Sequence, residues 1–142
     1  MLVRCLYASR PSPPFDGKVL DRILDQSRAN NPRLGVTGLL CVADNLFLQV
    51  LEGGRDAVCE RFNAIVRDDR HDHLRLLVFE EIGERRFGNW TMGQVSIDRL
   101  NPALLLKYFK RAELDPFDCS GQASLRLLTE LVDSGSIAMR GE

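Results

Sequence analysis

The chain has 142 residues, of which 44% are hydrophobic and 27% charged, so it can build the core of one ordinary domain and is not globally disordered. Nineteen Lys and Arg against twenty Asp and Glu leave a net charge of -1, which argues against a nucleic-acid binder and against a polybasic membrane anchor. There is no apolar run of bilayer-spanning length and no signal-peptide pattern, and the four cysteines are scattered within apolar runs as buried thiols. We therefore expect a cytoplasmic protein with no membrane segment.

The first predicted elements are a strand and a helix. Leu2–Ala8 is apolar, and the proline-rich residues 9–14 that follow are expected to end the strand. Asp16 can cap a helix whose apolar positions recur every three or four residues. Because proline disfavours helical geometry at the residue before it, Pro32 predicts that this helix ends at Asn30 and Asn31.

Two strands, a second helix and two further strands follow. Residues 35–43 and 46–52 are strongly apolar, and the Asp44–Asn45 joint between them suits a tight hairpin. The second helix is expected over Asp56–Val66, with an apolar face made by Val58, Phe62, Ile65 and Val66. The last two strands are expected at Leu74–Glu81 and Trp90–Ile97.

This order predicts an α+β, ferredoxin-like β-α-β-β-α-β-β fold with one five-stranded mixed sheet and two helices on one face. The first and third strands should lie in the centre, and the fifth most simply pairs with the fourth at an edge. Both faces of the central strands are apolar, so the open face needs cover. Two helices expected after residue 100 can supply it, in cis or across a dimer. We expect a domain at 1–98 and a helical extension at 99–142.

Three polar residues stand out in this apolar framework. Gln49 lies at the centre of a central strand, where a buried amide needs hydrogen-bond partners. A structural hydrogen bond would explain Gln49 alone, and a lone strand tyrosine is usually amphipathic core. Tyr7 on the neighbouring strand and Asn31 at the end of the first helix converge on the same space, which is typical of a small-ligand pocket. The loop His71–His73 has no third metal ligand in view, so no metal site is expected.

At this point the sequence resembles the BLUF family of blue-light sensors that use flavin. The resemblance covers roughly residues 2–97 and rests on five motifs in order. They are Leu6-Tyr7-Ala8-Ser9-Arg10, Ser27-Arg28-Ala29-Asn30-Asn31 with Gly35-Val36-Thr37-Gly38-Leu39-Leu40, Phe47-Leu48-Gln49-Val50-Leu51-Glu52-Gly53, Asp69-Arg70-His71, and Phe87-Gly88-Asn89-Trp90-Thr91-Met92. The chain looks like a short, stand-alone member of the family.

The resemblance implies that FAD, with FMN or riboflavin as alternatives, lies between the two helices. By this resemblance Tyr7 is the photochemical electron and proton donor, and Gln49 bridges Tyr7 to the flavin N5/O4 edge. Rearrangement of the Gln49 amide would redden the flavin absorption. Trp90 and Met92 match the strand that relays the signal. The remaining cofactor-binding residues implied by the family are Ser9, Ile23, Asn30, Asn31, Ile65, Arg70 and His71.

The leading hypothesis is therefore a non-enzymatic light sensor that signals to an unknown protein in trans through its last strand and tail helices. No nucleic-acid partner is expected, and the open sheet face is compatible with a homodimer. The alternative is a ferredoxin-like regulatory module that binds a small molecule without photochemistry. A small hydrolase of acylphosphatase type ranks last, because residues 11–14 lack the glycine-rich donors that cradle an anion.

Overall fold

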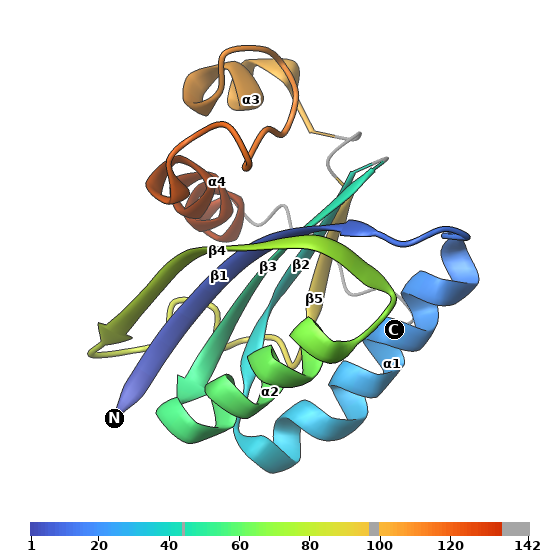
Figure 1. Cartoon of the computed structure of the whole chain (residues 1–142). Helices are drawn as coiled ribbons and strands as arrows, with labels where there is room; N and C mark the ends of the chain where they lie inside the picture. The colour runs from blue at the N-terminus through green and yellow to red at the C-terminus, as the bar shows by residue number, and fades with distance from the viewer. Residues whose placement is uncertain (44, 97–99, 135–142) are drawn as a thin grey trace.

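The computed structural model describes residues 1–43, 45–96 and 100–134. Its strands are β1 (Leu2–Pro11), β2 (Thr37–Ala43), β3 (Leu46–Gly54), β4 (His71–Ile82) and β5 (Gly93–Ser96). Its helices are α1 (Gly17–Leu34), α2 (Arg55–Arg67), α3 (Pro102–Tyr108) and α4 (Gly121–Asp133). One mixed sheet separates α1 and α2 on one face from α3 and α4 on the other, which confirms the expected α+β architecture (Figure 1).

The sheet has the strand order β4-β1-β3-β2-β5. β1 and β3 occupy its centre and run antiparallel, with Tyr7 directly opposite Gln49. Side chains on opposite residues of an antiparallel pair point to the same face. The central pairing therefore brings the phenol and the amide together, as the alternation in the sequence predicts.

The expected position of the fifth strand is wrong. β5 pairs in parallel with β2, with Leu39 opposite Gly93, and makes no ladder with β4. The buried carboxylate of Glu52 on β3 explains this route, because it accepts hydrogen bonds from the backbone N–H groups of Arg86 and Phe87. Phe87 is itself fully buried. These contacts draw the chain after β4 across the end of the sheet to the far edge.

The first helix is also longer than predicted. α1 continues through Pro32 to Leu34. The proline lies in the last turn, where Gly35 adopts a left-handed conformation with φ of 70° and its N–H caps the carbonyls of Asn31 and Pro32. This cap satisfies the carbonyls at the helix end, and it keeps Asn31 on the helix and facing the sheet.

Two further boundaries differ. β1 runs on to Pro11 along β4 because proline is tolerated at the end of a strand. The ladder of the last strand is confined to Gly93–Ser96, although Trp90 before it still accepts a backbone hydrogen bond from Gly38 of β2, and Ile97 lies outside the described residues. Asp44 of the expected hairpin turn and the expected domain boundary at residue 98 also lie outside them.

The helix-facing core joins alternate residues of β1 and β3 to α1 and α2. It contains Val3, Cys5, Tyr7, Leu20, Ile23, Leu24, Val36, Leu40, Phe47, Leu51, Val58, Ile65 and Met92. On α2 the expected apolar face is only partly right. Val58 and Ile65 are buried, whereas Val66, one position farther round the helix, is 54% exposed.

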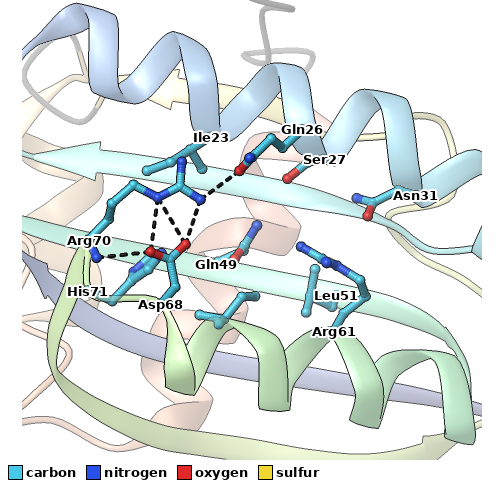
Figure 2. Close-up of a pocket in the computed structure, with 11 residues that line it drawn as sticks. Ile23, Gln26, Ser27, Asn31, Gln49, Leu51, Arg61, Asp68, Arg70 and His71 are labelled. Atoms are coloured by element: carbon cyan, nitrogen blue, oxygen red, sulfur yellow. Dashed lines mark hydrogen bonds and ion pairs between the residues drawn. The ribbon is translucent and has the colours of Figure 1, made fainter.

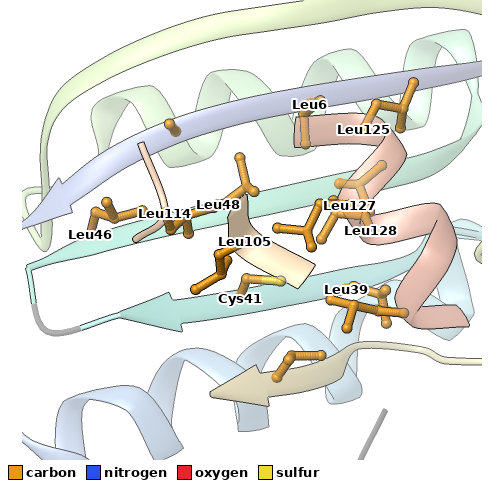
Figure 3. Close-up of a cluster of buried hydrophobic side chains, with 14 of the residues drawn as sticks. Leu6, Leu39, Cys41, Leu46, Leu48, Leu105, Leu114, Leu125, Leu127 and Leu128 are labelled. Atoms are coloured by element: carbon orange, nitrogen blue, oxygen red, sulfur yellow. The ribbon is translucent and has the colours of Figure 1, made fainter. Parts of the chain in front are cut away.

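The opposite face of the sheet is covered by the tail helices, as expected. Leu6 and Leu48 of the central strands pack with Leu105 of α3 and with Leu127 and Leu128 of α4 in one buried cluster (Figure 3). Its partly buried members include Leu104, Tyr108 and Val132. Among the described residues, no helix is long and apolar enough to cross a bilayer.

Candidate functional site

The centre of the helix-facing core contains a hydrogen-bonded chain of three side chains. The Tyr7 hydroxyl donates to Oε1 of Gln49. The Nε2 group of Gln49 donates to Sδ of Met92 at 3.3 Å. Tyr7 and Met92 are fully buried and Gln49 is 3% exposed. Both ends of the Gln49 amide are thus engaged, one by the Tyr7 hydroxyl and the other by the Met92 sulfur.

Tyr7 is held in its neutral form. Burial raises the pKa of the Tyr7 phenol well above its ordinary value, and nearby Cys5 acts in the same direction while Arg61 opposes it. The O–H proton therefore stays on Tyr7 and remains available to the glutamine carbonyl. The ring also makes edge-on contacts with Phe62 and His71, with centroids 5.9 and 6.2 Å apart.

The segment before β5 presents Trp90 and Met92 to opposite faces of the sheet. Met92 belongs to the helix-facing core beside Gln49, whereas Trp90 is partly buried against the cluster under α3 and α4. Met92, rather than Trp90, is the neighbour of the glutamine in this structure. This short segment therefore contacts both the polar chain at Gln49 and the tail-facing core.

Three successive backbone carbonyls of that segment accept hydrogen bonds that hold it in place. Gly38 of β2 donates its backbone N–H to Trp90 at 3.0 Å, Asn31 donates Nδ2 to Thr91 at 2.9 Å, and Arg28 donates to Met92. A Cβ added to Gly38 would lie 2.0 Å from the Val50 carbonyl oxygen, so only glycine fits at this crossing. The segment before β5 is thus fastened to α1 by Arg28 and by Asn31, and Asn31 also lines the cavity.

A narrow cavity lies next to Gln49, between α1 and α2 (Figure 2). Its lining residues are Ile23, Gln26, Ser27, Asn31, Gln49, Leu51, Arg61, Ile65, Asp68, Arg70 and His71. The cavity measures about 20 Å³, which is room for roughly one water molecule. A larger ligand therefore requires the two walls to move apart.

Arg70 spans the cavity mouth. Its guanidinium pairs with the Asp68 carboxylate at 2.5 Å and also donates to Oε1 of Gln26 on α1 at 2.6 Å (Figure 2). Burial alone would raise the pKa of Asp68, but the hydrogen bonds and charge of Arg70 hold it below its usual value. The Arg70 side chain therefore links the residue before β4 to α1 across the cavity.

His71 connects the cavity to β1. Its Nδ1 lies 2.9 Å from the hydroxyl oxygen of Ser9, which is fully buried. Burial lowers the pKa of His71, with Asp68 opposing and Arg70 reinforcing the shift. A neutral imidazole in this position can exchange a hydrogen bond with Ser9 without bringing a net charge into the core.

Most of the site residues expected from sequence line the cavity or adjoin it. Tyr7, Met92 and Ser9 lie behind the lining, in contact with Gln49 or His71. Asn30 is not among the lining residues, and its Oδ1 accepts a hydrogen bond from Arg33. The lining residues that sequence reasoning did not name as site residues are Gln26, Ser27, Leu51, Arg61 and Asp68. Helical spacing from Ile23 and Ile65 could have found Gln26, Ser27 and Arg61.

The lining suits a flat heteroaromatic ligand. Ile23 and Ile65 contribute apolar surfaces from the two helices, and polar side chains stand between them. One acceptor is left without a partner, because Oδ1 of Asn31 is buried and makes no hydrogen bond. An unsatisfied buried amide oxygen has a cost of about 1–3 kcal/mol, which a ligand N–H would relieve. Within the described parts of the chain, no three side chains are grouped as metal ligands.

Comparisons with known proteins give a family and two solved structures that this chain resembles. A family model described as sensors of blue-light using FAD (BLUF) matches residues 2–93. The photoactivated adenylate cyclase subunit beta of Euglena longa is 29% identical over 100 residues, which are 70% of this chain but only 12% of that protein. The chain therefore spans about an eighth of that curated relative.

Two solved structures are similar over nearly the whole chain. The dark-state structure of BlrB, described as a BLUF protein, superposes with a TM-score of 0.80 at 32% identity, covering 94% of this chain and 96% of that one. BlsA in its photo-activated state superposes with a TM-score of 0.83 at 31% identity, covering 93% of this chain and 95% of that one.

Proposed function

Because the chain belongs to the BLUF family of blue-light sensors that use FAD, we propose that it holds a flavin between α1 and α2 and reads the absorbed light through Tyr7 and Gln49. The observation that carries this proposal is the buried Tyr7–Gln49–Met92 chain beside the cavity. A bound flavin supplies the absorption of blue light and, when excited, a strong one-electron oxidant. FAD is the form the family description names.

The residues that would hold the ring offer it apolar surfaces on its two faces and polar groups along its edge. Ile23 and Ile65 would flank its faces, and Asn31 would offer its unpaired Oδ1. Gln49, Arg70 and His71 complete the polar edge of the cavity. Ring entry has to break the Arg70–Gln26 contact and spread the two helices, because the present cavity holds about one water molecule.

Tyr7 is the proposed electron and proton donor. Burial keeps the pKa of Tyr7 high, so the phenol starts neutral with its proton directed at Gln49. Gln49 is suited to switching because an amide has a donor end and an acceptor end. Exchange of these ends would direct Nε2 at Tyr7 and Oε1 at Met92. A neutral hydrogen bond contributes about 1 kcal/mol, so the change acts as a modest population shift.

The proposed output runs through the segment before β5 to the tail. Met92 contacts Gln49, and Trp90 packs on the cluster that α3 and α4 cover. A change at Gln49 can therefore alter how the tail helices pack on the sheet. We assign residues 1–98 to flavin binding and residues 99–142 to an extension that presents the signal to a protein in trans.

The test is an absorption spectrum taken in the dark and after blue illumination. We expect the purified wild-type protein to show a flavin spectrum that shifts to longer wavelength in light and recovers in the dark. Tyr7→Phe should retain the bound flavin and lose the shift. Tyr108→Phe, which changes the second tyrosine of the chain, should keep both the flavin and the shift. A protein that cannot be reconstituted with any flavin would refute the proposal.

A further inference from the structure

β4 is a long strand at the edge of the sheet. It lies at the end of the strand order opposite β5, and its only strand neighbour within the described residues is β1 (Figure 1). The other edge is protected by its shortness, because the ladder of β5 spans only Gly93–Ser96. β4 extends over His71–Ile82, a length of 12 residues that contains no proline. Its outer side therefore presents a row of backbone N–H and C=O groups that another strand can bind.

Two large apolar side chains of this strand are exposed on the same face. Leu76 is 51% and Phe79 is 39% exposed. Their partners in the ladder with β1 are Tyr7 and Cys5, which both belong to the helix-facing core. Because opposite residues of an antiparallel pair point to the same face, Leu76 and Phe79 both project from the helix-facing side of the sheet. Positions three apart face opposite sides in a regular strand, and the extra residue Leu77 at the register shift between the two pairs brings them together.

Charged residues of opposite sign flank this apolar segment. Arg75 precedes it and Glu80 follows it. Their partners on β1 are Ala8 and Arg4, which alternate with the residues of the helix-facing core, so both charges project from the tail-facing side. Arg75 is exposed. Glu80 pairs with Arg4 at 2.9 Å through one of its two carboxylate oxygens, which leaves the carboxylate able to accept from a second cation.

From this pattern we propose that β4 pairs with β4 of a second copy of this chain, antiparallel and about a two-fold axis that passes between Leu77 and Val78. Arg75 of each copy then lies opposite the partner's Glu80, and Leu76 lies opposite the partner's Phe79. Each of these contacts occurs twice, because a two-fold interface repeats every contact. Both pairings join residues that project from the same face, as an antiparallel ladder requires. A shift by one residue would set Leu76 against the partner's Glu80, although these side chains project from opposite faces.

Charge complementarity and closure favour a second copy as the occupant of this edge. The flanking charges of the segment are opposite in sign, so reversing its direction sets each charge against its complement. Pairing uses the long edge of both copies and leaves only the two short β5 edges, so assembly ends at the dimer. The paired segment is short, which makes the interface small and its dissociation constant of about micromolar order. The pairing involves no residue of the cavity, so it is independent of the proposed function.

The experiment measures the dimer dissociation constant of the full chain by sedimentation velocity in the dark, over about three decades of micromolar protein concentration. Leu76→Lys and Leu106→Lys form a matched pair, because both leucines are exposed, to 51% and 56%, but Leu106 lies on α3. A second set consists of Arg75→Glu and Glu80→Lys, each alone and in an equimolar mixture. Each variant alone sets like charges against each other at both contacts, whereas the mixed dimer has opposite charges at both. Circular dichroism confirms that each variant is folded.

We expect the wild type and Leu106→Lys to dimerise alike, and Leu76→Lys to raise the dissociation constant by about tenfold or more. Arg75→Glu and Glu80→Lys alone should each raise it by about ten- to a hundredfold, and their mixture should recover most of the loss. The mixture decides the register, because Glu80→Lys alone also removes the contact with Arg4. A wild type that stays monomeric, a dimer that dissociates in Leu106→Lys but not in Leu76→Lys, or a mixture without recovery would overturn the proposed pairing.

Discussion

The guanidinium of Arg28 on α1 donates to the backbone carbonyl of Met92 through both Nε and Nη2, each 3.3 Å from the oxygen. This contact fastens the segment that precedes β5 to the helix that forms one wall of the cavity. Asn31, one turn farther along the same helix, holds the adjacent carbonyl of Thr91. The wall of the cavity and the segment beside Gln49 are therefore joined by hydrogen bonds from both Arg28 and Asn31.

Removing the Arg28 contact should loosen the edge strand. We expect Arg28→Leu to lower the free energy of unfolding by about 1–2 kcal/mol, in the range of hydrogen bonds from charged donors. Amide hydrogen exchange in residues 93–96 should become faster, because β5 is a short edge strand that directly follows the segment held by Arg28. Arg33→Leu is the control, because Arg33 is exposed on the same helix and its guanidinium donates to the nearby side chain of Asn30. Equal exchange rates in the two variants would contradict the prediction.

Tyr7 and Gln49 should depend on each other for stability. Tyr7→Phe leaves the Gln49 carbonyl without its donor, and Gln49→Leu leaves the Tyr7 hydroxyl without its acceptor. Each change should cost about 1–3 kcal/mol, because a buried polar group then lacks a partner. The double variant should cost less than the sum of the two. Urea unfolding of the four proteins measures this coupling, and strict additivity would mean that the bond contributes nothing.

Gln49→Leu should also abolish the light-induced red shift while dark absorption of bound flavin remains. The leucine has no donor or acceptor end to exchange, so the electronic environment of the ring cannot switch. Met92→Leu is the control, because it alters the weaker thioether contact and keeps the amide in place. A normal shift in Gln49→Leu would place the switching amide elsewhere.

The raised pKa of Tyr7 predicts that this phenol does not ionise while the protein is folded. A group whose pKa is raised on folding stabilises the folded state fully below its unfolded pKa, about 10 for tyrosine, and this contribution is lost as the pH rises above that value. The tyrosinate absorbance of folded wild type and Tyr7→Phe should therefore coincide up to alkaline unfolding. An extra tyrosinate signal in the wild type before unfolding would disprove the assignment.

The lowered pKa of His71 predicts the opposite dependence of stability on pH. Between the folded pKa and the unfolded value of about 6.5, the unfolded chain binds more protons, so stability should rise with pH across that window and fall in acid. Melting temperatures from pH 8 down to pH 5 measure the effect. His71→Gln should show a smaller loss in acid relative to its own value at pH 8. An identical pH profile in both proteins would show that His71 is not the titrating group.

The tail helices should contribute directly to the stability of the sheet. Leu128 of α4 is fully buried against the central strands. Leu128→Ala should cost about 2–5 kcal/mol of unfolding free energy, as large-to-small changes in packed cores do. Leu106→Ala in α3, where the side chain is 56% exposed, should cost much less. Chemical unfolding compares the two, and similar small losses would mean that the tail does not belong to the cooperative core.

The sequence by itself determined the elements that are local in origin. The alternation of side chains along β1 and β3 placed Tyr7 and Gln49 on one face of the sheet. The apolar residues on the other face predicted that it is covered, and α3 and α4 supply this cover. These features follow from the period-2 geometry of strands and the need to bury apolar surface. The motifs around Tyr7, Asn31 and Gln49 identified the family for the same reason, since they lie within single elements.

Only the tertiary structure decided features that depend on partners far apart in the chain. β5 pairs with β2 because the Glu52 carboxylate accepts hydrogen bonds from the backbone N–H groups of Arg86 and Phe87. The strand propensity of residues 93–96 gives no information about this contact. The last turn of α1, which contains Pro32, is tied to the rest of the fold by the buried Asn31 side chain, which donates to the carbonyl of the distant Thr91. The Arg70 guanidinium likewise joins Asp68 to Gln26 of α1, which lies 44 positions before Arg70 in the chain. Such long-range contacts offset local preferences of similar size, so no local pattern could reveal them.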